Sequence, residues 1–165
     1  MRGISLICMA LLYFCCLSNT YASEKILADF VLVKKSDRLM FLMSGRKVIK
    51  SYKVSLGRNP VGHKVKQGDF RTPEGLYTID YRNPQSQFNF SLHINYPNEQ
   101  DKRLARERGV DPGGEIFIHG LPNGKNYPDL FDGVDWTRGC IGVDNIEIME
   151  IAKLVPNGTP IQIDP

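Results

Sequence analysis

The chain has 165 residues, of which 42% are hydrophobic and 24% charged, and its formal net charge is +3. This composition is ordinary for one globular domain and excludes an intrinsically disordered protein or a coiled coil. The small net charge and the lack of a lysine-rich tract argue against a nucleic-acid or membrane-surface partner.

Residues 1–22 have the pattern of a secretory signal peptide. Arg2 precedes a nearly continuous apolar stretch, residues 4–17, and the small residue Ala22 suits a cleavage site. The stretch is shorter than the roughly 20 apolar residues that a membrane-spanning helix needs. We therefore predict a periplasmic or otherwise exported bacterial protein, with a mature domain of residues 23–165 that has no stable membrane insertion.

Cleavage would leave one thiol in the mature protein. Of the four cysteines, Cys8, Cys15 and Cys16 lie in the predicted signal, so only Cys140 remains. In an oxidising compartment a lone cysteine is buried and inert, paired between chains, or kept for its reactivity.

The mature chain reads mainly as β-structure. Short apolar or alternating runs predict an antiparallel meander over residues 30–56, followed by a long Gly- and Pro-rich loop at 57–75. A loop of this length in a compact domain is usually functional or disordered. Further strands are predicted at residues 76–79, 90–96, 115–119 and 161–163.

Two short helices complete the predicted fold. Asn98 can cap a polar helix over residues 99–108. Asp144, with Glu147 three residues later, has the spacing of a capping box for a second helix, which Pro156 ends. The fold class we predict is therefore mainly β, in a single domain with two short helices.

Cys140 lies in a turn-like run, Thr-Arg-Gly-Cys-Ile, and is the candidate nucleophile. Cysteine catalysis needs a thiolate, a base and donors for the oxyanion. Gly139 lets the backbone turn tightly and bring its N–H groups near the sulfur, and Arg138 is expected to lower the pKa of the thiol. The alternative is that Cys140 is a small buried hydrophobic residue.

Three histidines compete for the role of base. His119 ends an apolar strand just before Gly120, where a side chain can face a cleft, although a satisfied core histidine has the same pattern. We expect His93 on the polar face of a strand and His63 in solvent. A zinc site of His93, His119 and Cys140 is a weak alternative, because no close pair of ligands is present. We expect neither a metal nor another cofactor.

These residues resemble the L,D-transpeptidases of bacterial cell walls, the YkuD-type catalytic domain. Members carry a histidine and, after a loop, the run [Ser/Thr]-[His/Arg]-Gly-Cys, which His119 and residues 137–140 match. Residues 68–77, GDFRTPEGLY, look like the family stretch G-D-x-[K/R]-T-P-x-G-x-Y, and residues 57–62 look like the loop that precedes it. The resemblance runs from about residue 30 to residue 163.

The resemblance implies a β-sandwich-like catalytic domain with assigned residues. Cys140 would be the nucleophile and His119 the proton acceptor, oriented by the backbone carbonyl of Gly120. The oxyanion and substrate-binding groups would come from Gly139, Arg138 and Thr137.

The resemblance also implies a substrate, the stem peptide of peptidoglycan. Cys140 would attack the bond between diaminopimelate and D-alanine, and an amine would resolve the thioester as a 3→3 cross-link or as a lipoprotein attachment. Gly142 and Val143 stand where many members have arginine and an apolar residue. Together with the Asp135-Trp136 pair, this is similar to a short periplasmic branch with enzymes that release wall-bound lipoprotein. A hydrolytic L,D-carboxypeptidase or amidase, and a non-catalytic wall-binding protein, are the alternatives.

Overall fold

The computed structural model describes residues 26–124 and 134–165, so the predicted signal segment, residues 1–22, lies outside the described residues. Within the described part the chain forms strands and two helices, in this order: β1 (Phe30–Lys34), β2 (Leu39–Ser44), β3 (Lys47–Lys53), β4 (Gly75–Asn83), β5 (Ser91–Ile94), α1 (Glu99–Glu107), β6 (Ile116–His119), β7 (Ile141–Gly142), α2 (Asn145–Leu154) and β8 (Thr159–Asp164). The predicted mainly β class with two short helices is confirmed. No helix in this part of the chain is both long and apolar enough to cross a bilayer.

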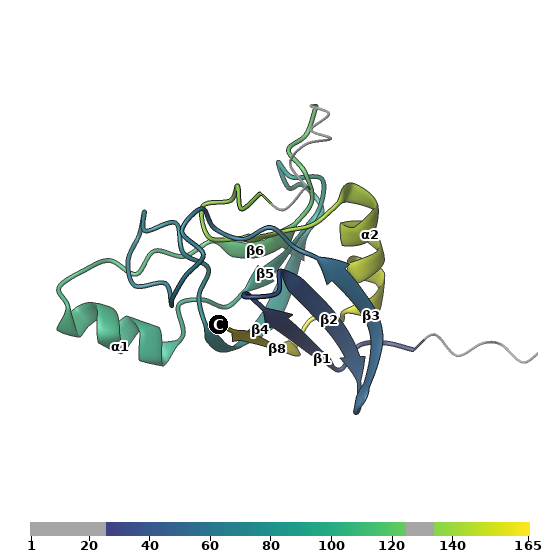
Figure 1. Ribbon diagram of the computed structural model, residues 1–165, viewed down its shortest axis with the longest axis horizontal. Helices are drawn as coiled ribbons and strands as arrows, with labels where there is room; N and C mark the ends of the chain where they lie inside the picture. The colour runs from purple at the N-terminus through teal and green to yellow at the C-terminus, as the bar shows by residue number, and fades with distance from the viewer. Residues whose placement is uncertain (1–25, 125–133) are drawn as a thin grey trace, which may run out of the picture.

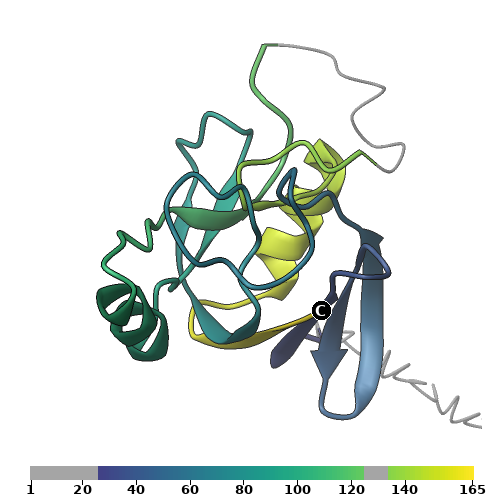
Figure 2. The ribbon, with the colours of Figure 1, turned by 60° about the vertical axis from the view of Figure 1, so that its left-hand side comes forward.

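The strands form one curled sheet in the order β3-β2-β1-β8-β4-β5-β6-β7 (Figure 1). The first three strands are the predicted antiparallel meander. The last strand, β8, pairs parallel with β1 and antiparallel with β4, so the end of the chain joins the two halves of the sheet. Figure 2 shows α2 between these halves, with α1 on the far side of β4–β6.

The core is built from aliphatic residues that are direct cross-strand neighbours. Val31 pairs with Leu42 on one side and with Ile161 on the other, and Ile161 pairs with Tyr77. The three aliphatic side chains are fully buried. Burial of each contributes about 1.5–3 kcal/mol relative to an exposed position, so this row holds the two halves together.

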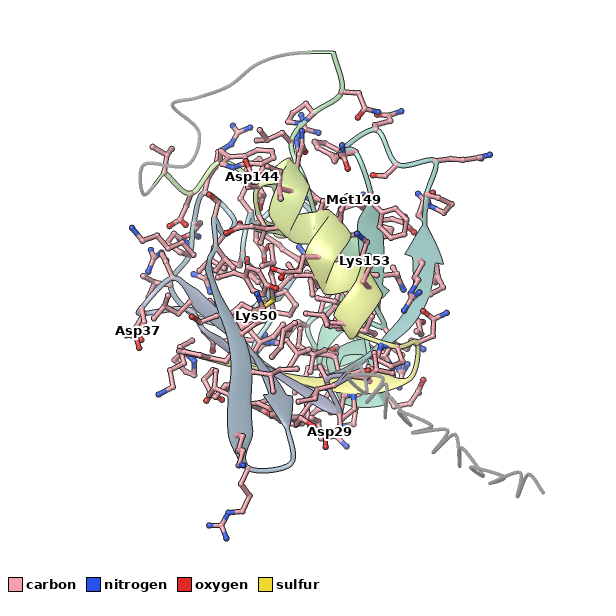
Figure 3. All side chains as sticks on the ribbon, turned by 90° about the vertical axis from the view of Figure 1, so that its right-hand side faces the viewer. Asp29, Asp37, Lys50, Asp144, Met149 and Lys153 are labelled. Carbon is pink, nitrogen blue, oxygen red and sulfur yellow. The ribbon has the colours of Figure 1, made fainter. Side chains whose placement is uncertain are left out.

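Helix α2 begins at the predicted capping box and closes the core from one side. Asp144 accepts the Ile146 N–H at 2.7 Å, while the Glu147 carboxylate accepts the Asp144 N–H at 3.0 Å. Glu150 forms an ion pair with Lys50 of β3 at 2.7 Å. In Figure 3, α2 runs from Asp144 past Met149 and lies beside the strand that carries Lys50.

Helix α1 has the predicted Asn98 cap and supports the long loop through a buried carboxylate. Asp101 accepts a hydrogen bond from the Tyr77 hydroxyl at 3.1 Å and lies 3.2 Å from Nε2 of His63. Nδ1 of His63 accepts the Glu74 N–H at 3.0 Å. The prediction that His63 is solvated is therefore wrong, because the loop folds back and both ring nitrogens have protein partners.

The two edges of the curled sheet meet beside the predicted nucleophile. Ser55, just after β3, exchanges backbone hydrogen bonds of 2.9 and 2.8 Å with Gly142 of β7. Thr137 donates its N–H to Leu56 at 3.1 Å. The sequence analysis gave no indication of this closure, because it joins segments more than 80 residues apart.

Gly57 makes the closest backbone approach at this junction. A Cβ atom there would lie 2.1 Å from the Phe70 carbonyl oxygen and 3.0 Å from Cα of Gly139. The Gly57 N–H also donates to the buried Thr72 hydroxyl at 3.0 Å. The GDFRTP loop and the Cys140 turn are thus packed against the same glycine.

We predict that Gly57→Ala lowers the free energy of unfolding by about 2 kcal/mol or more, because the new methyl group cannot be accommodated without moving backbone. Urea denaturation would measure the loss. Gly114→Ala is the matched control, since its Cβ would meet nothing closer than 3.9 Å. It should change stability by no more than about 0.5 kcal/mol. Equal stability of the Gly57→Ala and wild-type proteins would contradict the packing described.

Candidate active site

The turn before Cys140 is held by the side chain of Thr137. The Thr137 hydroxyl accepts the Gly139 N–H at 3.1 Å and donates to the Cys140 carbonyl at 2.8 Å. Gly139 has φ +130°, and a Cβ there would lie 2.7 Å from the Arg71 carbonyl oxygen. Glycine is therefore required at this position for both its conformation and its contact.

The Cys140 sulfur lies along the edge of β6. The thiol donates to the Glu115 carbonyl at 3.5 Å. Burial raises the pKa of the thiol to about 11, although its hydrogen bond with the Phe117 N–H and the charge of Lys64 act in the opposite direction. The positive charge that lowers this pKa is that of Lys64 and not, as expected, that of Arg138, and desolvation of the sulfur outweighs it.

His119 is buried and has a defined tautomer. Its Nδ1 lies 2.7 Å from the Gly120 carbonyl oxygen, and since a carbonyl only accepts, Nδ1 carries the proton. Nε2 of the neutral ring is then free to accept a proton. Burial lowers the pKa of His119 despite the Gly120 hydrogen bond, so the ring is neutral at pH 7.

Two aromatic rings hold the imidazole of His119. Phe88 lies 4.5 Å from it and Trp136 lies edge-on at 5.4 Å, both measured between ring centroids. Gly142 is the register partner of His119 across β6 and β7. A Cβ at Gly142 would lie 3.1 Å from the indole, so glycine at this position makes room for Trp136.

Gly120 is also required by packing. A Cβ at this position would lie 2.6 Å from Oδ1 of Asn145, which accepts the Leu121 N–H at 2.8 Å. The Gly120 N–H donates to the Phe88 carbonyl at 3.1 Å. The backbone of Gly120, whose carbonyl orients His119, is therefore fixed by Phe88 before this carbonyl and by Asn145 after it.

Cys140 and His119 share a cavity of about 420 Å³ on the outer face of the sheet. Its floor is a cross-strand row, Asn83, Ser91 and His119, taken from β4, β5 and β6 in register. Cys140 also lines a second cavity, of about 560 Å³, together with Lys64 and Arg138. The thiol is therefore open to two separate spaces.

The long loop over residues 57–75 brings Lys64 to the second cavity. Its ammonium lies 2.9 Å from Asp69, whose carboxylate also accepts the N–H groups of Val65, Lys66 and Arg71 at 2.7–3.1 Å. Desolvation alone would raise the pKa of Asp69, but these hydrogen bonds together hold it at about 2. The carboxylate therefore stays charged and fixes the loop.

The remaining candidate ligands lie apart from this arrangement. His93 is on the polar face of β5, as predicted, and its Nδ1 lies 2.6 Å from Asp80. Among the described residues, no group of three or more His, Cys, Asp or Glu is placed to hold a metal ion.

Sequence reasoning missed several residues of the site. Asp69 is within the matched GDFRTPEGLY stretch and Lys64 lies just before it, so the motif indicated the region but not the roles of these two residues. Phe88 and Glu115 gave no signal, since one lies in an irregular loop and the other was read as part of a strand. Glu115 instead has φ +55° and ends outside β6, with its carbonyl facing the sulfur.

Comparison with known proteins gives the same family that the sequence motifs resemble. The family model YkuD, described as the L,D-transpeptidase catalytic domain, matches residues 28–163. The chain is 32% identical over 110 residues to the protein named "Putative L,D-transpeptidase YafK" of Escherichia coli (strain K12). That match covers 66% of this chain and 37% of YafK.

Solved structures show the same fold. The helical cell shape determining protein Pgp2 of Campylobacter jejuni is 27% identical with a TM-score of 0.63, covering 82% of this chain and 47% of Pgp2. Bd1075 of Bdellovibrio bacteriovorus is 29% identical with a TM-score of 0.57, covering 86% of this chain and 49% of Bd1075. The chain spans less than half the length of YafK, Pgp2 and Bd1075.

The raised thiol pKa predicts a distinctive alkylation profile. The rate at which iodoacetamide modifies Cys140, followed by peptide mass spectrometry, should rise about tenfold per pH unit from pH 7 to pH 10 without levelling. The reason is that the thiolate fraction keeps growing until the pH passes the thiol pKa. The urea-unfolded protein, as control, should level near the ordinary value of about 8.5. A plateau below pH 9 in the folded protein would contradict the raised pKa of the thiol.

Proposed function

Because this chain belongs to the L,D-transpeptidase family with the YkuD-type catalytic domain, we propose that it is an exported cysteine acyl-transferase of peptidoglycan. Its substrate would be the stem tetrapeptide, cleaved between diaminopimelate and D-alanine. The observation that carries the proposal is the shared cavity, which is lined both by Cys140 and by a buried, neutral histidine with a fixed tautomer.

The resting pair is a neutral thiol and a neutral imidazole. As the sulfur attacks the diaminopimelate carbonyl carbon, the thiol proton passes to Nε2 of His119. The tetrahedral intermediate then collapses, the C–N bond breaks, and the imidazolium returns the proton to the leaving amine of D-alanine. A thioester on Cys140 and an uncharged His119 remain.

The oxyanion needs donors that the fold does not already use. The Gly139 N–H is engaged by Thr137, so we assign the Cys140 N–H to the oxyanion and give Gly139 the role of shaping the turn. Arg138 is exposed and lines the second cavity, where it can attract a substrate carboxylate. Thr137 would act through the turn rather than through substrate.

The second cavity favours transfer over hydrolysis. An acyl acceptor can reach the thioester from that side while the donor stem remains in the first cavity. The acceptor would be an amine of another stem, giving a 3→3 cross-link, or a lysine of a lipoprotein. Release of wall-bound lipoprotein and trimming by water would pass through the same acyl-enzyme. These reactions differ from transfer only in the leaving group and in the acyl acceptor.

Export and cellular role follow from the same proposal. Residues 1–22 would direct the protein to the periplasm, and residues 23–165 would be the mature catalytic domain. Since Pgp2 is described as a helical cell shape determining protein, we extend to this chain the proposal that its action on the wall alters cell shape.

Muropeptide digestion tests the function. The purified protein, incubated with tetrapeptide muropeptides with and without attached lipoprotein, should give products that mass spectrometry identifies as cross-linked, trimmed or detached. Cys140→Ala should abolish them, because no other group supplies the nucleophile.

Lys153→Ala is the control, since Lys153 lies on the outer side of α2, away from both cavities (Figure 3). It should keep wild-type turnover. Equal turnover by Cys140→Ala and wild type would overturn the mechanism. The absence of any product from every substrate would favour a wall-binding protein without catalysis.

The pH dependence of turnover tests the role of His119. Imidazolium cannot accept the thiol proton, so kcat/KM should fall as the pH drops through the His119 pKa. Because burial lowers that pKa, the midpoint of the acid limb should lie below about 6.5, the ordinary value. A midpoint at or above 6.5, measured on the muropeptide substrate, would show that the histidine is not the buried neutral base described.

A further inference from the structure

A second cross-strand row lies beside the floor of the catalytic cavity. Tyr81 of β4 pairs with His93 of β5, which in turn pairs with Phe117 of β6. This row is two residues along the strands from the cavity floor formed by Asn83, Ser91 and His119, so both rows are on the same face of the sheet. Phe117 belongs to both regions, because it also lines the catalytic cavity.

The three rings form a continuous aromatic strip. Tyr81 stacks on His93 with centroids 4.4 Å apart and planes 19° apart, and His93 meets Phe117 at 4.9 Å. Tyr81 is 42% exposed, so its ring is open to solvent. The strip therefore reaches from the cavity to solvent.

A bulge adds a carboxylate to the strip. The register of β4 against β5 shifts between Ile79 and Tyr81, which leaves Asp80 as the extra residue. Bulges re-aim side chains, and here Asp80 and Tyr81 both lie on the outer face, where Asp80 contacts Nδ1 of His93 at 2.6 Å. The Asp80 side chain is 42% exposed, so its second oxygen remains open to a ligand.

Rings beside a carboxylate and an imidazole suit a sugar. A pyranose presents a face of C–H groups that is attracted to the negative face of an aromatic ring, while its hydroxyl and acetamide groups need hydrogen-bond partners. We propose that Tyr81, His93 and Phe117, with Asp80, form a subsite for an N-acetylated sugar of the glycan strand that carries the stem peptide. This proposal rests on the proposed function of the Cys140 site.

The spacing fits such an occupant. From β6 to β4 the strip crosses two interstrand spacings, about 10 Å in all. The three residues that join the acylated carbonyl of diaminopimelate to the sugar also span about 10 Å when extended. A stem that starts at the edge of β6, along which the Cys140 sulfur lies, and runs across the strip would thus place its sugar beside Tyr81.

The test compares substrates with and without the sugar. For Tyr81→Ala, kcat/KM on the disaccharide tetrapeptide should fall by about fivefold, roughly the effect of losing one aromatic contact, while kcat/KM on the free tetrapeptide stays within about twofold of wild type. Tyr81→Phe should keep wild-type values on both. Leu76→Ala is the control, because Leu76 is an exposed apolar residue of the same strand, outside the strip.

A binding measurement separates this proposal from the proposed function. Glycan strands stripped of their peptides should bind the wild-type protein in calorimetry and bind Tyr81→Ala about fivefold more weakly. If neither peptide substrate is turned over, the proposed function fails, and this binding measurement alone decides the subsite. Equal losses on both peptide substrates would show that the strip contacts peptide, and unchanged glycan binding by Tyr81→Ala would also overturn the sugar subsite.

Discussion

The position of the thiol depends on the closure of the curled sheet. Ser55 and Gly142 join its two edges through a pair of backbone hydrogen bonds, two residues after Cys140. Gly57 and Gly139 then pack so closely that neither position has space for a Cβ. Because three backbone segments meet here without intervening side chains, the Cys140 turn can shift only if the closure itself opens.

Buried charges give the loop its shape, and burial also sets the chemistry. Lys35 is almost fully buried, with its ammonium 2.8 Å from Glu74 and bonded to the carbonyls of Gly62 and Thr72. Burial lowers the pKa of Lys35, with Glu74 opposing that change. At Cys140 the hydrogen bond from Phe117 and the charge of Lys64 offset only part of the desolvation of the sulfur, so the pKa of the thiol remains raised. The thiol therefore stays protonated at neutral pH.

His119 shows how one face of the sheet serves two purposes. Its ring is held between Phe88 and Trp136, and its carbonyl neighbour holds Nδ1, so only Nε2 remains for chemistry. The rows of β4, β5 and β6 continue outward from His119 to the aromatic strip at Tyr81. A rigid sheet thus aligns the Cys140 and His119 side chains with the aromatic strip.

Local patterns in the sequence were sufficient for most of the elements and for the candidate residues of the site. Alternation located the strands, the spacing of Asp144 and Glu147 located α2, and the short runs around His119 and Cys140 indicated the chemistry, because each depends on neighbours within a few residues. Only the tertiary structure decided that β8 joins the two halves and that His63 is bonded inside the loop. It also placed the charge of Lys64, outweighed by burial, beside the thiol. Those outcomes arise from contacts between distant segments and from the water they exclude, which no local pattern records.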